Sequence, residues 1–161
     1  MTLSENGGAS IRPATTSDLA TLLEFRMAMI VELFGGEYAP DVDQVATTAA
    51  NERWIAEHFG RDFIAWMADL DGKPVASAAL MWFPHPPGPK NPTGMEAYIL
   101  NVYTRPEARR MGLARALMDR LVEAARAAGA RRVWLRASAD GRLLYESMGF
   151  REGDYLQLTP D

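Results

Sequence analysis

One segment in the second half of the chain, residues 97–128, constrains the fold most, because a strand pattern there runs directly into an amphipathic helix. Ala97 to Thr104 is an almost unbroken run of apolar and aromatic residues, as in a buried strand. After Gly112, apolar side chains recur at helical spacing on one face: Leu113, Leu117, Leu121, Ala124 and Ala128. Gly129 is a typical helix end. A strand joined to a helix by so short a turn predicts an α/β domain.

The remaining patterns supply the other elements of a single sheet. Strands are expected at residues 11–14, 63–70, 75–83, 132–136 and 155–158, and helices at residues 16–34, 43–59 and 141–148. Asp71-Gly72 is typical of a type I′ hairpin turn, because both residues tolerate a positive φ. We expect residues 1–10 to be a tail and residues 11–161 to form one domain with one central sheet.

Composition excludes several classes of function. The 161 residues include no cysteine, which excludes thiolate zinc sites and a cysteine nucleophile. The formal net charge of −4 argues against nucleic-acid binding. No apolar run approaches the roughly 20 residues of a membrane helix, and the N-terminus lacks a signal-peptide pattern, so we expect a cytoplasmic protein that binds no membrane. Neither His58 nor His85 belongs to a ligand cluster, so no metal site is expected.

The turn before the long helix has the chemistry of an anion site. Backbone N–H groups in the first helical turn have no partner within the helix and lie at the positive end of its macrodipole. A glycine at this point, Gly112, lets a phosphate approach the backbone closely. Arg109, Arg110 and Arg115 add positive charge. The dinucleotide and Walker A glycine patterns are absent. A plain turn with solvated arginines is the alternative.

Two motifs in this order resemble the GNAT superfamily of N-acetyltransferases. Arg109-x-x-Gly112-x-Ala114 matches that family's acetyl-CoA loop, (Gln/Arg)-x-x-Gly-x-(Gly/Ala). Leu144-Tyr145-Glu146-Ser147-Met148-Gly149-Phe150 resembles its second signature, Leu-Tyr-x-x-x-Gly-Phe. The order of elements from Ile11 to Leu158 is also similar. The resemblance implies a mixed, mostly antiparallel sheet flanked by helices, with acetyl-CoA as cosubstrate.

The resemblance also implies which positions hold acetyl-CoA. The loop amides would bind the pyrophosphate, and the strand backbone would pair with the pantetheine arm. Ser138 stands where many relatives have an asparagine that contacts the cosubstrate, and Arg142 is placed to reach a phosphate or else to be a solvated helix arginine. The expected cosubstrate-binding residues are Val102, Thr104, Arg109, Arg110, Met111, Gly112, Leu113, Ala114, Arg115, Ser138 and Arg142.

For catalysis, the resemblance places the Tyr145 hydroxyl near the cosubstrate sulfur as a general acid, with simple packing as the alternative. Glu96 is the expected base, acting directly or through water, and a solvated glutamate is its alternative. An alkyl amine with a pKa of about 10 must lose a proton before it can attack. Without a cysteine, direct attack through a tetrahedral intermediate is favoured over an acetyl-enzyme.

The function expected from these residues is transfer of an acetyl group from acetyl-CoA to a primary amine. The acceptor is a small-molecule amine or a peptide, and its binding should involve the first two helices and the proline-rich loop at residues 84–94. A non-catalytic acyl-CoA sensor and an enzyme acting on a protein N-terminus are the alternatives. Nothing in the sequence specifies whether the chain forms a homodimer through its sheet edge.

Overall fold

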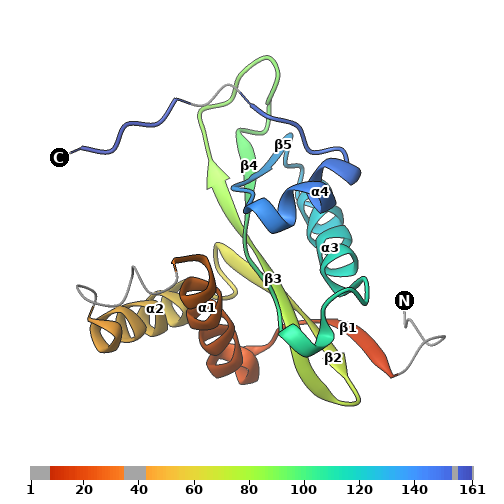
Figure 1. Cartoon of the computed structure of the whole chain (residues 1–161). Coiled ribbons are helices and arrows are strands. Elements are labelled where there is room, and N and C mark those ends of the chain that lie inside the picture. Colours follow the sequence, from red (N-terminus) through yellow and green to blue (C-terminus); the bar gives the residue numbers. More distant parts are fainter. Residues whose placement is uncertain (1–7, 35–42, 154–155, 161) are drawn as a thin grey trace.

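Five strands form one sheet in the order β1-β2-β3-β4-β5. The computed structural model describes residues 8–34, 43–153 and 156–160. The strands are β1 (Ala9–Pro13), β2 (Phe63–Leu70), β3 (Lys73–Pro84), β4 (Met95–Thr104) and β5 (Arg132–Leu135). The first four strands pair antiparallel, and β4 and β5 pair parallel. The predicted mixed, mostly antiparallel α/β sheet is therefore confirmed (Figure 1).

Helices cover both faces of the sheet. They are the 3₁₀ turns η1 (Thr16–Asp18) and η3 (Pro106–Ala108) and the α-helices α1 (Leu19–Phe34), α2 (Gln44–His58), α3 (Leu113–Ala127) and α4 (Ala139–Ser147). One core cluster joins Phe25 of α1 and Ile55 of α2 to one face of the sheet. The other joins Leu117 of α3 and Tyr145 of α4 to the opposite face. Figure 1 shows the two helix pairs on either side of the strands.

The predicted hairpin turn between β2 and β3 is confirmed. Asp71 has a φ of 51° and Gly72 a φ of 76°, so both residues take the left-handed conformation that a type I′ turn requires. A tight turn fixes the register of the two strands, which pair from Leu70 with Lys73 back to Phe63 with Met81. The hairpin thus positions β3 as the central strand beside β4.

The predicted closing strand at residues 155–158 is wrong. Residues 156–160 form no strand, and the side chains of Leu156 and Leu158 are 100% and 86% exposed. A strand needs a neighbouring strand to share hydrogen bonds with and an apolar face to bury. Two alternating leucines supply too little apolar surface to stabilise such a strand. β1 begins at Ala9, within the segment predicted as a tail. Residues 1–7 lie outside the described residues.

No helix in the described part of the chain is long and apolar enough to cross a bilayer. Within residues 8–34, 43–153 and 156–160, no cluster of three His, Asp or Glu side chains could hold a metal ion.

A partly buried ion-pair network joins β1, η1 and β2. Arg12 donates to Asp18 from both terminal nitrogens, at 2.8 and 2.9 Å, and its Nε donates to Asp69 at 2.6 Å. Asp18 is 6% exposed and also accepts the backbone N–H of Thr15, which completes a capping box. The hydrogen bonds from Arg12 lower the pKa of Asp18 to about 2, and the two carboxylates raise the pKa of Arg12.

We expect Asp18→Asn to lower the free energy of unfolding at pH 7 by about 2 kcal/mol, because each pKa unit corresponds to about 1.4 kcal/mol. The folded pKa of Asp18 lies below its unfolded value of 3.8, so its contribution is full above that value and is lost as the pH falls toward 2. Urea unfolding of both proteins at pH 7, 5 and 3 measures this loss. The exposed Asp119→Asn is the control, and a wild-type advantage that persists undiminished at pH 3 would contradict the expectation.

Candidate functional site

A bulge in β4 opens the sheet at its centre. Ser77 pairs with Tyr103 and Ala79 with Leu100, so β4 uses three steps where β3 uses two. The additional residue bends the strand, and Asn101 takes a left-handed φ of 53°. On its other edge β4 pairs with β5 only as far as Ile99. Among the described strands, none pairs with that edge beyond Ile99, and its backbone groups there can bind an extended ligand.

The gap between β4 and β5 that opens beyond Ile99 leads to the start of α3. Gly112 is the N-cap of this helix, with a φ of 78°, and no side chain caps the helix. Arg110 in the same turn also has a positive φ, of 65°. A Cβ built on Gly112 would meet no atom within 4 Å, so the space beside this glycine is open. Uncapped amides facing open space suit an anionic ligand.

Two of the arginines around this turn, Arg109 and Arg115, are engaged by other residues. Arg109 binds both carboxylate oxygens of Glu32 on α1, at 2.8 and 2.7 Å, and its Nε donates to the carbonyl of Thr104. Arg115 donates to the hydroxyl of Ser147 at 3.1 Å. These contacts connect the turn to α1 and α4. The Arg109 side chain therefore holds the turn against α1 and β4. What the turn presents to a ligand is its own backbone.

Tyr145, on α4, is tightly packed in the core on the α3 side of the sheet. Its side chain is 8% exposed, and its ring packs against Phe150 with centroids 6.1 Å apart. A Cβ on Gly141 would lie 2.7 Å from the Tyr145 ring, so a larger residue there would displace it. Burial raises the pKa of Tyr145, which keeps the hydroxyl protonated at neutral pH. The predicted cosubstrate contact Ser138 caps α4 by accepting from Gly141 N–H.

Arg142 faces carboxylates on its own helix and on the following segment. It contacts Glu152 at 2.8 Å and Glu146 at 3.6 Å. This arrangement is close to the solvated helix arginine that the sequence left as an alternative. Its predicted role at a phosphate is not tested by these contacts and remains a prediction.

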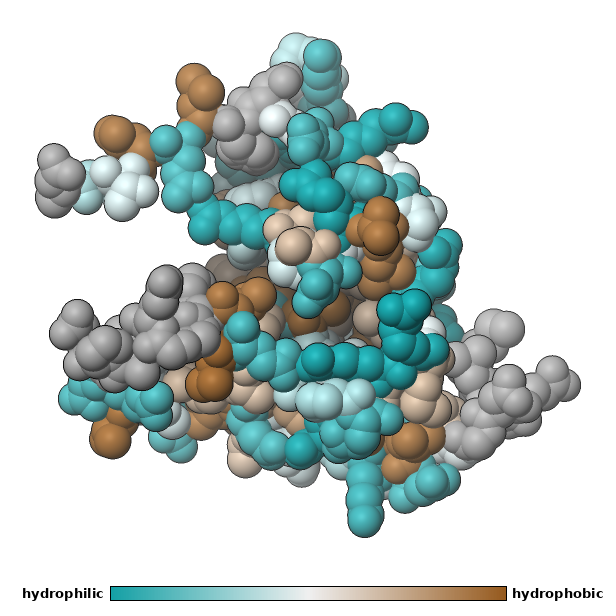
Figure 2. Space-filling view, viewed as in Figure 1, coloured by the Kyte–Doolittle hydropathy of each residue, from teal (hydrophilic) through white to brown (hydrophobic). Residues whose placement is uncertain are grey.

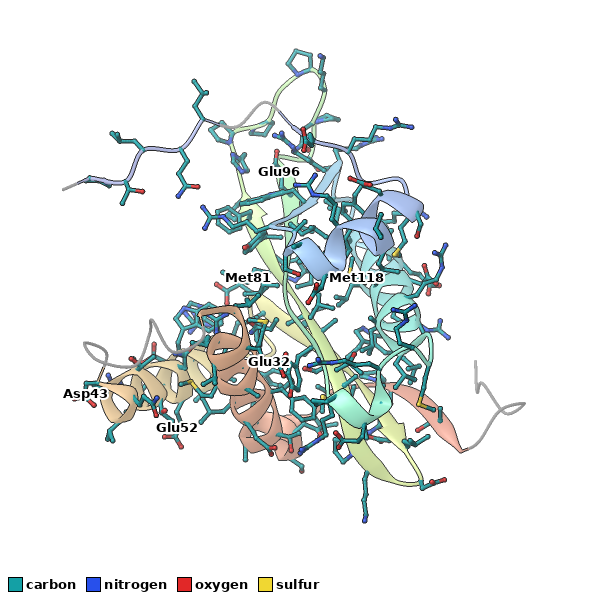
Figure 3. All side chains as sticks on the ribbon, in the orientation of Figure 1. Glu32, Asp43, Glu52, Met81, Glu96 and Met118 are labelled. Atoms are coloured by element: carbon teal, nitrogen blue, oxygen red, sulfur yellow. The ribbon has the colours of Figure 1, made fainter. Side chains whose placement is uncertain are left out.

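Glu96 is buried at the start of β4, on the α1 side of the sheet. It is 8% exposed; its Oε2 lies 3.3 Å from His85 Nε2 and its Oε1 lies 3.7 Å from Arg132. Figure 3 shows it near the loop that joins β3 to β4, far from Glu32. Glu96 and Leu100 share a face of β4 but are separated by four residues, about 13 Å along the strand. A base at that distance from the bulge would need a chain of waters, and the role of Glu96 stays a prediction.

Aromatic rings lie between Glu96 and the bulge. Tyr98 stacks on Trp134 with centroids 4.3 Å apart, and Phe83 meets the edge of each ring at 6.4 and 5.6 Å. These rings are half-buried, and in Figure 1 α1 and α2 lie beside only the lower part of the strands. Figure 2 shows the surface indented above α1, with hydrophobic side chains at its floor.

A cavity of about 360 Å³ lies beside the bulge, between α1, α2 and β4. Its lining residues are Arg26, Ala50, Asn51, Trp54, Ile55, Leu100 and Asn101. Sequence reasoning missed the polar members of this set. Arg26 lies in a predicted helix and Asn101, with its left-handed φ of 53°, in a predicted strand, and neither residue stood out in the sequence.

A family model for GNAT acetyltransferases matches residues 27–150 of the chain. This match covers the bulged strand, the glycine turn, α3 and α4. The chain belongs to the GNAT acetyltransferase family. The predicted family is thus confirmed, and with it the cosubstrate that the family uses, acetyl-CoA.

Solved structures of GNAT acetyltransferases superpose on almost the whole chain. A predicted acetyltransferase from Clostridium acetobutylicum, crystallised with acetyl-CoA, is 28% identical, with a TM-score of 0.83 over 94% of this chain and 96% of its own. A GCN5-related N-acetyltransferase from Ralstonia eutropha is 26% identical, with a TM-score of 0.82 over 95% and 99%. Glucosamine-6-phosphate N-acetyltransferase from Arabidopsis thaliana, at 17% identity and a TM-score of 0.59 over 95% and 97%, supports the fold alone. No curated protein matches the chain significantly.

Of the predicted cosubstrate residues, those on β4 and in the glycine turn follow one another along the chain, whereas Ser138 and Arg142 lie at α4. Val102 and Thr104 lie on the unpaired edge of β4, and the glycine turn from Arg110 to Arg115 follows after η3. Tyr145 belongs to the core on the α3 side, whereas Glu96 lies on the α1 side. Their individual roles remain predictions. The two predicted catalytic residues thus lie on opposite faces of the sheet.

Proposed function

We propose that this chain is an N-acetyltransferase that moves an acetyl group from acetyl-CoA to a primary amine. One observation carries the proposal: the unpaired edge of β4 begins at the bulge and leads to the uncapped glycine turn of α3. An extended chain ending in a pyrophosphate matches this path. The pantetheine amides would pair with the backbone at Val102 and Thr104, and the pyrophosphate would meet the amides around Gly112.

In the proposed reaction, the neutral amine attacks the acetyl carbon from the α1 side of the gap. Its nitrogen forms the new C–N bond, and the bond between carbon and sulfur breaks as the tetrahedral intermediate collapses. The amine's proton passes through water to Glu96, and the departing sulfur receives a proton from Tyr145 on the other side of the sheet. A backbone N–H at the bulge would stabilise the oxyanion.

The first test of the proposal is thermal unfolding with and without acetyl-CoA. A ligand that binds only the native state stabilises it by RT ln(1 + [L]/Kd), about 2.7 kcal/mol at a hundredfold excess over Kd. We expect acetyl-CoA and free CoA to raise the melting temperature and ATP to leave it unchanged. An equal shift with ATP, or none with millimolar acetyl-CoA, would refute the proposed cosubstrate site.

Turnover separates the enzyme from a non-catalytic acyl-CoA sensor. Thiol release in a panel of small amines and of peptides with a free N-terminus reports acetyl transfer directly. The cysteine-free protein adds no thiol background to this assay. Acetyl-CoA binding without thiol release from any amine or peptide would favour the sensor.

A further inference from the structure

Glu32, on α1, is a carboxylate that the proposed reaction does not use, although it joins α1 to the start of the glycine turn. Both of its oxygens accept hydrogen bonds from Nη2 of Arg109, at 2.8 and 2.7 Å. Nε of the same arginine donates to the carbonyl oxygen of Thr104, at the end of β4, at 3.0 Å. A single guanidinium therefore ties Arg109 to a helix and to a strand, three residues before Gly112.

These contacts restrain the point at which the chain enters a strained turn. Arg110, the next residue, has a φ of 65°, a left-handed conformation that few residues other than glycine adopt. Such backbone persists only where the surrounding structure fixes it. The contacts of Arg109 with Glu32 and Thr104 fix the residue directly before it.

The same ion pair directs the Arg109 side chain toward α1, whereas the glycine turn leads into α3. These two helices pack against opposite faces of the sheet, α1 through Phe25 and α3 through Leu117. The first amides of α3 have no side-chain cap, and no atom lies within 4 Å of a Cβ built on Gly112. The guanidinium is thus held on the α1 side, and the space beside Gly112 stays open to an anion.

We propose that Glu32 is a positioning residue for acetyl-CoA, which holds Arg109 and so keeps the glycine turn in the conformation that meets the pyrophosphate. The inference rests on the proposed function, and it adds a residue outside both sequence motifs that sets the affinity for the cosubstrate. Charge-assisted hydrogen bonds to two partners fix the planar guanidinium in one orientation, which restrains the turn more than contact with either partner alone would.

A second ion pair on α1 offers a matched control. Arg105 donates to Glu24 at 2.6 Å, and this pair also joins α1 to the chain just after β4. Arg105 precedes η3, which separates it from the glycine turn. Removing the charge of Glu24 therefore changes the same helix by the same charge without releasing Arg109.

The test is a double-mutant cycle on the affinity for free CoA, measured by isothermal titration. Glu32→Gln keeps the size of the side chain and removes its charge, and we expect it to weaken binding about 5-fold, the upper end for an exposed ion pair. Arg109→Met keeps an unbranched stem without the guanidinium and should weaken binding at least as much. Because Glu32 acts through Arg109, adding Glu32→Gln to Arg109→Met should cause no further loss. Glu24→Gln should leave the affinity unchanged.

Three outcomes would overturn the inference. Tighter binding by Glu32→Gln would mean that Glu32 competes with the pyrophosphate for Arg109. Equal losses in Glu24→Gln and Glu32→Gln would mean that the charge of α1 matters and the turn contact does not. Additive losses in the double variant would mean that Glu32 and Arg109 act independently. If Arg109→Met does not fold, the comparison of Glu32→Gln with Glu24→Gln still decides the matter. A wild type that binds no CoA would instead refute the proposed function itself.

Discussion

Gly112→Asp should weaken binding of acetyl-CoA at least 100-fold while the protein remains folded. The glycine caps α3, and the space beside it is open to a ligand. An aspartate there would place a negative charge against the pyrophosphate. At about 5 Å and an effective dielectric constant of 20, one such pair of charges repels by about 3 kcal/mol, which corresponds to a more than 100-fold weaker Kd. Isothermal titration with free CoA measures this loss without requiring an acceptor.

Gly112→Asn is the matched control for charge. Asparagine has the same size as aspartate and tolerates the positive φ of 78° at this position. We expect Gly112→Asn to weaken binding much less than Gly112→Asp. Gly60→Asp controls for position, since Gly60 also has a φ of 78° and no atom within 4 Å of a built Cβ. Equal affinities for the aspartate and asparagine variants would show that no phosphate lies at this turn.

The fold was predictable wherever one local pattern dominated. Three local patterns specify their own elements with little help from distant residues. They are the helical spacing of apolar residues in α3, the Asp71-Gly72 turn, and the apolar runs of β2 and β3. The prediction of a closing strand at residues 155–158 was wrong because the alternation of Leu156 and Leu158 forms a strand only if a partner strand stabilises it. Strand pairing is a non-local property, and a short pattern at a chain end gives no information about its partner.

The candidate site was predictable only in part, for a related reason. The glycine turn and Tyr145 belong to contiguous motifs, so their sequence neighbours identify them. His85 lies next to Glu96 only because the β3–β4 loop folds back. Arg26 meets Asn51 and Asn101 across 25 and 75 residues of chain, and no sequence spacing predicts such contacts. One signal was available: an asparagine inside an apolar strand indicates a break in the ladder.

Tyr145→Phe should lower kcat by at least 100-fold with little change in the affinity for acetyl-CoA. General acid catalysis contributes typically 10²- to 10⁴-fold, and the variant removes only the hydroxyl that would protonate the departing sulfur. The ring should keep its place, because neither its packing against Phe150 nor the space that Gly141 leaves for it depends on the hydroxyl. Since burial raises the pKa of Tyr145, the hydroxyl of the wild type can donate its proton throughout the neutral range. Single-turnover kinetics with the best acceptor from the amine panel measures the chemical step.

Tyr103→Phe is the matched control for this effect. Tyr103 is also 8% exposed, and burial raises its pKa too, but its ring packs against Phe25 on the α1 side of the sheet. Loss of that hydroxyl should leave kcat nearly unchanged. Gly141→Val provides an independent test, because it retains the Tyr145 hydroxyl but displaces the ring, and its kcat should also fall. If Tyr145→Phe and Tyr103→Phe reduce the single-turnover rate to the same small extent, Tyr145 packs against the cosubstrate and does not protonate the sulfur.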